Sequence, residues 1–137
     1  MWARKNSWGC VMDFWQAIVS GFKNYVVFGG RSSRSEYWYW VLALWIGGII
    51  TAIIDYAAFG TGFGAIDYGP VNSIFSVATI LPTLAVGIRR LHDIDRTGWW
   101  MLILLTLIGT LVLLYWACVR GTPGANRFGP DPLAGQT

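Results

Sequence analysis

Three long segments without a charged side chain constrain the fold of this 137-residue chain more than any other feature. They cover residues 37–54, 71–88 and 99–119, and each approaches the length that an α-helix needs to cross a bilayer, about 20 residues. Hydrophobic residues make up 55% of the chain and charged residues only 12%, whereas a soluble domain has about 25% charged residues. The sequence therefore predicts an all-α integral membrane protein with three transmembrane helices.

The segment before the first span, residues 12–28, has the periodicity of an amphipathic helix. Apolar residues follow at steps of three and four, as in Trp15, Ile18 and Phe22, and polar residues occupy much of the other face. Next to membrane spans, this pattern favours a helix that lies in the membrane interface. An amphipathic helix packed on the rest of the protein is the alternative.

The first two spans each carry a seam of small or polar residues. In the first span, Ala43, Gly47 and Thr51 lie four residues apart, which allows a second helix to approach closely. Pro82 in the second span lacks a backbone N–H and is expected to kink the helix, with Thr79 placed to compensate. The polar seam of the second span consists of Asn72, Ser76, Thr79 and Thr83.

The basic residues predict the orientation of the chain in the membrane. Eight of the ten lie before the first span or in the connector of residues 89–98, and none lies between the first two spans. Because cytoplasmic segments carry the excess of Lys and Arg, we expect the N-terminus and residues 89–98 in the cytoplasm. The irregular Gly- and Pro-rich tail, residues 120–137, would then lie outside. A re-entrant hairpin at 99–119 would return the tail to the cytoplasm, but 21 uncharged residues in a row favour a third span.

The charged residues beside the spans form the candidate site. Clustered arginines next to a span can bind the phosphates of anionic lipid headgroups, and nearby acids and a histidine can pair with them. The competing explanation is structural, because such charges also complement helix ends and Arg90 lies three residues before Asp93, where an internal pair fixes the turn. The candidate headgroup ligands are Arg31, Arg34, Arg89, Arg90 and Arg96. The candidate pairing residues are Glu36, His92, Asp93 and Asp95.

Other classes of function lack their motifs. Cys10, Cys118 and His92 are too few for a four-ligand zinc site, so neither a metal nor a cofactor is expected. No GxSxG nucleophile elbow and no GxxxxGK phosphate loop occurs, which argues against an enzyme and leaves no candidate catalytic residue. The sequence pI of about 9.1 could indicate nucleic acid, but basic residues that flank apolar spans favour a membrane face.

Three stretches resemble one known family. They are FGGRSSRSEYW at residues 28–38, Leu81-Pro82 leading to RRLHDIDRTGWW at 89–100, and GTPGANRFGPDP at 121–132. Together they span a single domain, residues 12–133, that resembles the bacterial inner-membrane family called domain of unknown function 805. The resemblance implies a bacterial inner (plasma) membrane location and supplies no catalytic residues. The family usually has a proline before the glycine of the third span, and its absence from residues 106–109 also favours an unbroken third span.

These observations favour a non-enzymatic, multi-pass membrane protein that organises anionic lipid headgroups or a membrane partner through its cytoplasmic charged cluster. The expected partners are the lipid bilayer with its anionic lipids, and a homo-oligomer or another membrane protein. The alternatives are a small oligomeric transporter or channel subunit that uses the polar seam of the second span, and a membrane enzyme.

Overall fold

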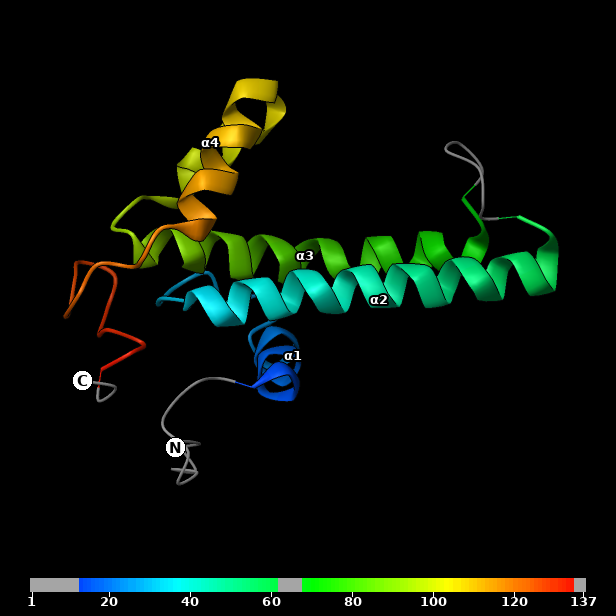
Figure 1. Ribbon diagram of the computed structural model, residues 1–137, viewed down its shortest axis with the longest axis horizontal. Coiled ribbons are helices and arrows are strands. Elements are labelled where there is room, and N and C mark those ends of the chain that lie inside the picture. The colour runs from blue at the N-terminus through cyan, green and yellow to red at the C-terminus, as the bar shows by residue number, and fades with distance from the viewer. Residues whose placement is uncertain (1–12, 62–67, 135–137) are drawn as a thin grey trace.

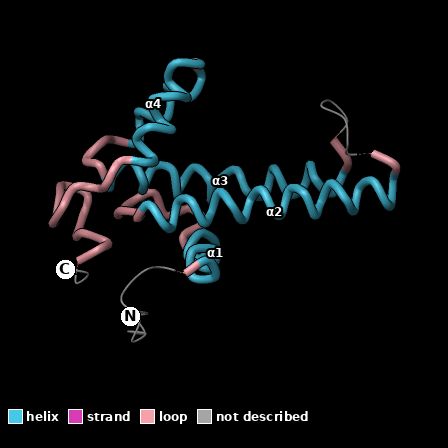
Figure 2. Tube along the Cα trace, in the orientation of Figure 1, coloured by secondary structure: helices cyan, strands magenta, loops and turns pink. Residues whose placement is uncertain are grey.

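The computed structural model describes residues 13–61 and 68–134, and within these ranges the chain is helical without a β-strand. Four elements are α-helices and one is a 3-10 helix, η1 (Figures 1 and 2). Their bounds are α1 Phe14–Lys23, α2 Arg34–Phe59, α3 Pro70–Asp93, η1 Gly98–Leu105 and α4 Leu107–Cys118. The prediction of an all-helical fold is confirmed.

Two long antiparallel helices, α2 and α3, lie side by side and form the axis of the molecule (Figure 1). With 26 and 24 residues, both are long and apolar enough to cross a membrane. They contain the predicted spans 37–54 and 71–88 and extend beyond both. The seam predicted on the first span faces α3, because Phe75 packs over Gly47, and the Asn72 side chain donates to Thr51 Oγ1 at 3.1 Å.

At the end of the pair where α2 ends and α3 begins, the two helices are joined by Asp55, which lies just beyond the predicted span 37–54. Asp55 lies inside α2 and is fully buried. Its carboxylate accepts the N–H groups of Val71 at 3.0 Å and Asn72 at 2.7 Å, at the first turn of α3. These N–H groups have no partner within their own helix, so the acid of one helix caps the other. Gly69 makes the approach feasible, since a Cβ there would stand 2.1 Å from Asp55 Cγ.

Helix α1 crosses α2 near the opposite end of the pair (Figure 1). It starts with a capping box formed by Asp13 and Gln16. Its close contact depends on Gly21, where a Cβ would lie 2.3 Å from the buried ring of Trp40. A helix therefore forms within the predicted range 12–28, and it packs on the protein; its location in a membrane interface stays a prediction.

Pro82 leaves one carbonyl of α3 without its helical partner, that of Ala78 four residues earlier. The hydroxyl of Tyr25, just after α1, donates to this carbonyl oxygen. Thr79, which the sequence suggested as the compensating residue, instead donates to the carbonyls of Phe75 and Ser76. The repair of α3 thus comes from another element, and it ties α1 to the middle of α3.

The predicted third span, residues 99–119, is not one helix, and the expectation of an unbroken span is wrong. The chain forms η1, becomes extended at Thr106, and continues as α4. At 1.5 Å per residue, the 12 residues of α4 measure about 18 Å, which is short of the roughly 30 Å hydrocarbon core. In the described part of the chain only α2 and α3 have the length of membrane-crossing helices.

The break between η1 and α4 lies at Thr106, and Gly109 and Thr110 stabilise it. The Thr106 hydroxyl accepts the Gly109 N–H at 3.0 Å and caps α4. Gly109 is required, because a Cβ there would lie 1.9 Å from the carbonyl oxygen of Ile103. Thr110 donates to the Thr106 carbonyl at 3.0 Å. These bonds satisfy the polar backbone groups of a reversal that is otherwise surrounded by exposed leucines.

Both ends of the η1–α4 hairpin therefore lie at the same end of the α2–α3 pair (Figure 1). The tail after α4 returns to the end of α3, where the Thr122 N–H donates to the Asp93 carbonyl at 2.7 Å. The connector and the tail, which an unbroken third span would separate, therefore lie together in the structure, and the side of the membrane on which they lie stays a prediction. They lie together because of the reversal at Thr106, which the hydrophobicity of the segment conceals.

Candidate functional site

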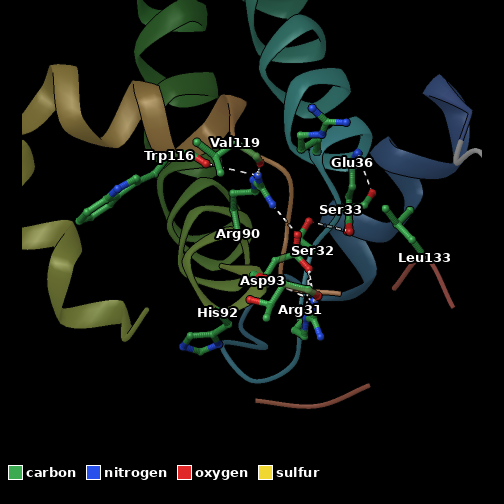
Figure 3. Close-up of polar contacts among 12 residues, drawn as sticks. Arg31, Ser32, Ser33, Glu36, Arg90, His92, Asp93, Trp116, Val119 and Leu133 are labelled. Carbon is green, nitrogen blue, oxygen red and sulfur yellow. Dashed lines mark hydrogen bonds and ion pairs between the residues drawn. The ribbon is translucent and has the colours of Figure 1, made fainter. Parts of the chain in front are cut away.

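The charged residues gather at the end of the molecule where α2 begins and α3 ends, and Asp93 is at their centre (Figure 3). Arg31 Nε donates to Asp93 Oδ1 at 3.0 Å, and Arg90 Nη1 donates to Asp93 Oδ2. The three side chains are only 1–3% exposed. The internal Arg90–Asp93 pair predicted from the sequence is therefore present, but it is buried and shared with a second arginine.

Backbone carbonyls accept hydrogen bonds from the Nη atoms of these two arginines, whereas Arg90 Nε is buried and has no hydrogen-bond partner. Arg31 donates to the carbonyls of Thr122 and Gly124 in the tail, the latter at 2.6 Å. Arg90 donates to the carbonyls of Trp116, at 3.2 Å, and Val119. Trp116 lies in the last turn of α4, where the helix dipole is negative and favours a cation. Arg31 and Arg90 thus hold the tail and the hairpin against the end of α3.

A second buried acid, Glu36, joins three helices. Its Oε1 accepts the Arg89 guanidinium at 3.3 Å and the Ser20 hydroxyl of α1 at 2.7 Å. Its Oε2 accepts the Ser32 hydroxyl at 2.6 Å. Arg89 Nε and Nη2 are buried and have no hydrogen-bond partner in the structure. Because a desolvated guanidinium depends on its counter-ion, Glu36 is the residue that makes Arg89 tolerable here.

The tail completes the site by covering the connector. The Asn126 side chain donates to the His92 carbonyl at 2.9 Å, and the Phe128 ring stacks on the His92 ring with centroids 4.0 Å apart. His92 Nδ1 lies 3.0 Å from the Gly30 carbonyl. In the tail itself, the N–H groups of Leu133 and Gly124 donate to Asp131 and lower the pKa of its carboxyl. The only histidine is thus held between two loops.

The other predicted site residues lie on the outside of this cluster. Arg34 is exposed and donates to the Cys118 carbonyl at 3.3 Å. Arg96 is exposed and lies 5.1 Å from the Trp116 ring centroid. Asp95 pairs with Arg127 at 3.1 Å, with both side chains about half exposed. Of the five predicted headgroup ligands, Arg31, Arg89 and Arg90 therefore point inward, whereas Arg34 and Arg96 face outward.

The polar seam of α3 lies along a groove between α2 and α3. Asn72 donates to the Gly48 carbonyl at 3.2 Å, and Thr83 accepts the Trp40 indole N–H at 3.2 Å. Thr79 bonds within its own helix, and Ser76 is exposed. Part of the seam, Asn72 and Thr83, therefore joins α2 to α3, whereas Ser76 faces the open groove.

Several residues of the site had no signal in the sequence analysis. The carbonyls of the tail could not be identified, because every residue has one. Gly121 offered a weak clue: a Cβ there would stand 2.0 Å from Asp93 Oδ2, so only glycine lets the tail pass. The described residues contain no group of three His, Cys, Asp or Glu side chains that could hold a metal ion.

Two apolar helices of membrane-crossing length, held together at one end by internally paired charges, define a small helical membrane protein. The family described as Protein of unknown function (DUF805) matches residues 25–130, and the chain belongs to this family. The resemblance found in the sequence motifs is confirmed.

The relatives place the chain among inner-membrane proteins. It is 44% identical to Inner membrane protein YhaI of Escherichia coli strain K12 over 121 residues, which cover 88% of this chain and 98% of the relative. It is 40% identical to Inner membrane protein YhaH of the same strain over 122 residues, which cover 88% and 97%. The Uncharacterized protein YiiR is 26% identical over 131 residues. No solved structure matches the chain.

Proposed function

We propose that this protein is a non-enzymatic membrane scaffold that binds anionic lipid headgroups with the outward-facing cations of its charged end. The observation that supports this role is the division of the arginines into two sets. The side chains of Arg31, Arg89 and Arg90 are buried and pair with acids of the chain itself, Asp93 and Glu36. Arg34, Arg96 and Arg120 are exposed around that end, where each cation near an anionic membrane surface contributes about 1 kcal/mol.

The proposed topology has two crossings, α2 and α3, with the η1–α4 hairpin entering the membrane from the charged face and returning to it. The charged end is then cytoplasmic, in agreement with the excess of basic residues there. Arg120 and Arg127, which a three-span topology leaves outside, lie at the same end as the other cations, because Arg127 pairs with Asp95 and Gly121, next to Arg120, packs against Asp93. Exposed tryptophans near the base of the hairpin, Trp99 and Trp100, suit the headgroup layer.

The polar seam gives less support to the alternative of a transport path. Asn72 and Thr83 use their side chains to join α2 to α3, and the groove beside them opens toward the outside of the pair. A path would need further helices to close it. An enzyme is not supported either, because His92 is stacked on Phe128 and bonded to the Gly30 carbonyl.

The test is the retention of anionic lipid by purified protein, measured by mass spectrometry of the protein released from native membranes. Arg34→Gln combined with Arg120→Gln is expected to weaken retention of phosphatidylglycerol and cardiolipin, by about fivefold for each arginine lost. Arg127→Gln is the matched control, because this exposed arginine already pairs with Asp95. Equal lipid retention in the double variant, the control and the unmodified chain would remove the proposed headgroup role.

A further inference from the structure

The connector between α3 and η1 carries an exposed arginine, Arg96, in a corner between two tryptophan rings. Its guanidinium carbon lies 5.7 Å from the ring centroid of Trp100 and 5.1 Å from that of Trp116. The two rings are nearly perpendicular, with an angle of 89° between them and centroids 5.4 Å apart. Aromatic faces attract a guanidinium group and favour a fixed orientation of its plane. These three residues, the Arg96 clamp, therefore hold a cation in place without a carboxylate.

Three separate parts of the chain bring the clamp together. Helix α3 ends in a Schellman motif with Asp95 as its left-handed residue, and the N–H of Arg96 donates to the Leu91 carbonyl at 2.9 Å. This motif fixes the backbone of Arg96 at the end of α3. Trp100 lies in η1, and Trp116 lies in the last turn of α4. The clamp is thus complete only when the hairpin is folded back on itself.

The clamp leaves the N–H groups of its guanidinium unused. No side-chain hydrogen bond and no ion pair joins Arg96 to another residue of the described chain. Arg127 is the informative comparison, because it is also exposed and lies over a ring, 4.8 Å from the Phe128 centroid. Its Nε and Nη2, however, already donate to Asp95. Arg96 therefore combines a fixed plane with free parallel donors, which is the arrangement that binds two oxygens of a phosphate group.

We propose that the Arg96 clamp binds the phosphate of an anionic lipid headgroup, an inference that rests on the headgroup role proposed for the charged end and makes it specific. The surroundings fit a lipid, because Trp99 is 79% exposed beside the clamp and Leu102 of η1 is 60% exposed. Tryptophan favours the headgroup layer, and the leucine offers contact to an acyl chain. Since α4 supplies Trp116, a lipid bound here stabilises the hairpin over a straightened segment.

The experiment is a titration of phosphatidylglycerol into the purified full chain in detergent, with bound lipid counted by native mass spectrometry. Arg96→Lys keeps the charge but loses the planar pair of donors, so the affinity should fall about tenfold. Arg127→Lys is the matched control and should bind as the unmodified chain does, because the donors of Arg127 already serve Asp95. Arg96 is exposed, so its replacement should leave the melting temperature without lipid unchanged. Trp116→Leu keeps the arginine, removes one wall of the corner and should weaken binding several-fold.

Inorganic phosphate separates a lipid site from a site for free phosphate. At the same molar concentration as the lipid and at constant ionic strength, it should not displace phosphatidylglycerol from the unmodified chain. Displacement by inorganic phosphate, or equal lipid affinity of Arg96→Lys and Arg127→Lys, would overturn the proposal. The Arg34→Gln and Arg120→Gln variant leaves the clamp intact and tests the general headgroup role, so the clamp and the proposed function can fail separately.

Discussion

At the scale of single residues, the charged end depends on one carboxylate. Asp93 serves two arginines that come from opposite sides, Arg31 before α2 and Arg90 within α3. All three side chains are buried, so removal of the acid leaves two desolvated cations facing each other. Loss of one partner of a buried ion pair costs about 3–5 kcal/mol, whereas an exposed pair contributes about 0–1 kcal/mol.

The first prediction compares the same substitution at two aspartates in one connector. Asp93→Asn should lower the free energy of unfolding by about 3–5 kcal/mol, because both arginines lose their counter-ion. Asp95→Asn should change it by less than about 1 kcal/mol, because its pair with Arg127 is exposed. Asparagine also accepts the positive φ of 60° found at Asp95. Thermal unfolding in detergent measures both, and equal melting temperatures would contradict the central role of Asp93.

The sequence predicted part of this arrangement. Arg90 and Asp93 are three residues apart on one helix, so their pairing follows from helical spacing. Arg31 is 62 residues from Asp93, and no local rule connects them. The sequence also could not predict that the side chains of Arg31 and Arg89 point into the protein. A basic residue next to a span can face the lipid headgroups or the protein, and its local sequence is the same in both cases.

At the scale of the elements, the sequence located best the helices that have a regular pattern of apolar residues. The long apolar runs identified α2 and α3, and periodicity identified α1. Hydrophobicity did not predict the break within residues 99–119, because a continuous helix and a hairpin of two short helices can have the same composition. The reversal depends on backbone geometry at Thr106 and Gly109, and the sequence there contains no proline to mark it.

The contact between Tyr25 and α3 leads to a prediction about two elements. Tyr25→Phe should lower the free energy of unfolding by about 0.5–1.5 kcal/mol, since the Ala78 carbonyl loses its donor. In a Pro82→Ala background the backbone N–H of residue 82 can bond to that carbonyl, so Tyr25→Phe should have a much smaller effect. A double-mutant cycle on detergent melting measures the coupling. Additive effects of the two substitutions would mean that Tyr25 acts through its ring contacts instead.

At the scale of the whole molecule, the hairpin is the feature on which the proposed number of membrane crossings depends. The hydrophobic pattern alone allowed three spans, and the two basic residues of the tail had to be accepted as exceptions. The structure connects the tail to Arg31, His92 and Asp93, so the tail follows the charged end wherever that end lies. The proposed count of two crossings thus depends on a few long-range polar contacts that no local pattern reveals.

The corresponding prediction concerns sidedness. In a chain without Cys10 and Cys118, Ala125→Cys in the tail should react with a membrane-impermeant thiol reagent only from the cytoplasmic side. Ala58→Cys, near the far end of α2, should react only from the opposite side. Both positions are exposed, so differences in reactivity reflect location. Labelling of both cysteines from the outside of intact spheroplasts would restore the three-span topology.

The reversal at Thr106 also affects the shape that this protein presents to the bilayer. Helix α1 and the η1–α4 hairpin both lie beside the charged half of the α2–α3 pair, and the other half consists of two helices alone (Figure 1). In the proposed orientation, one leaflet must accommodate a far wider cross-section than the other. Such a wedge displaces more lipid from the inner monolayer, and a membrane crowded with these molecules would experience an asymmetric lateral pressure that favours bending.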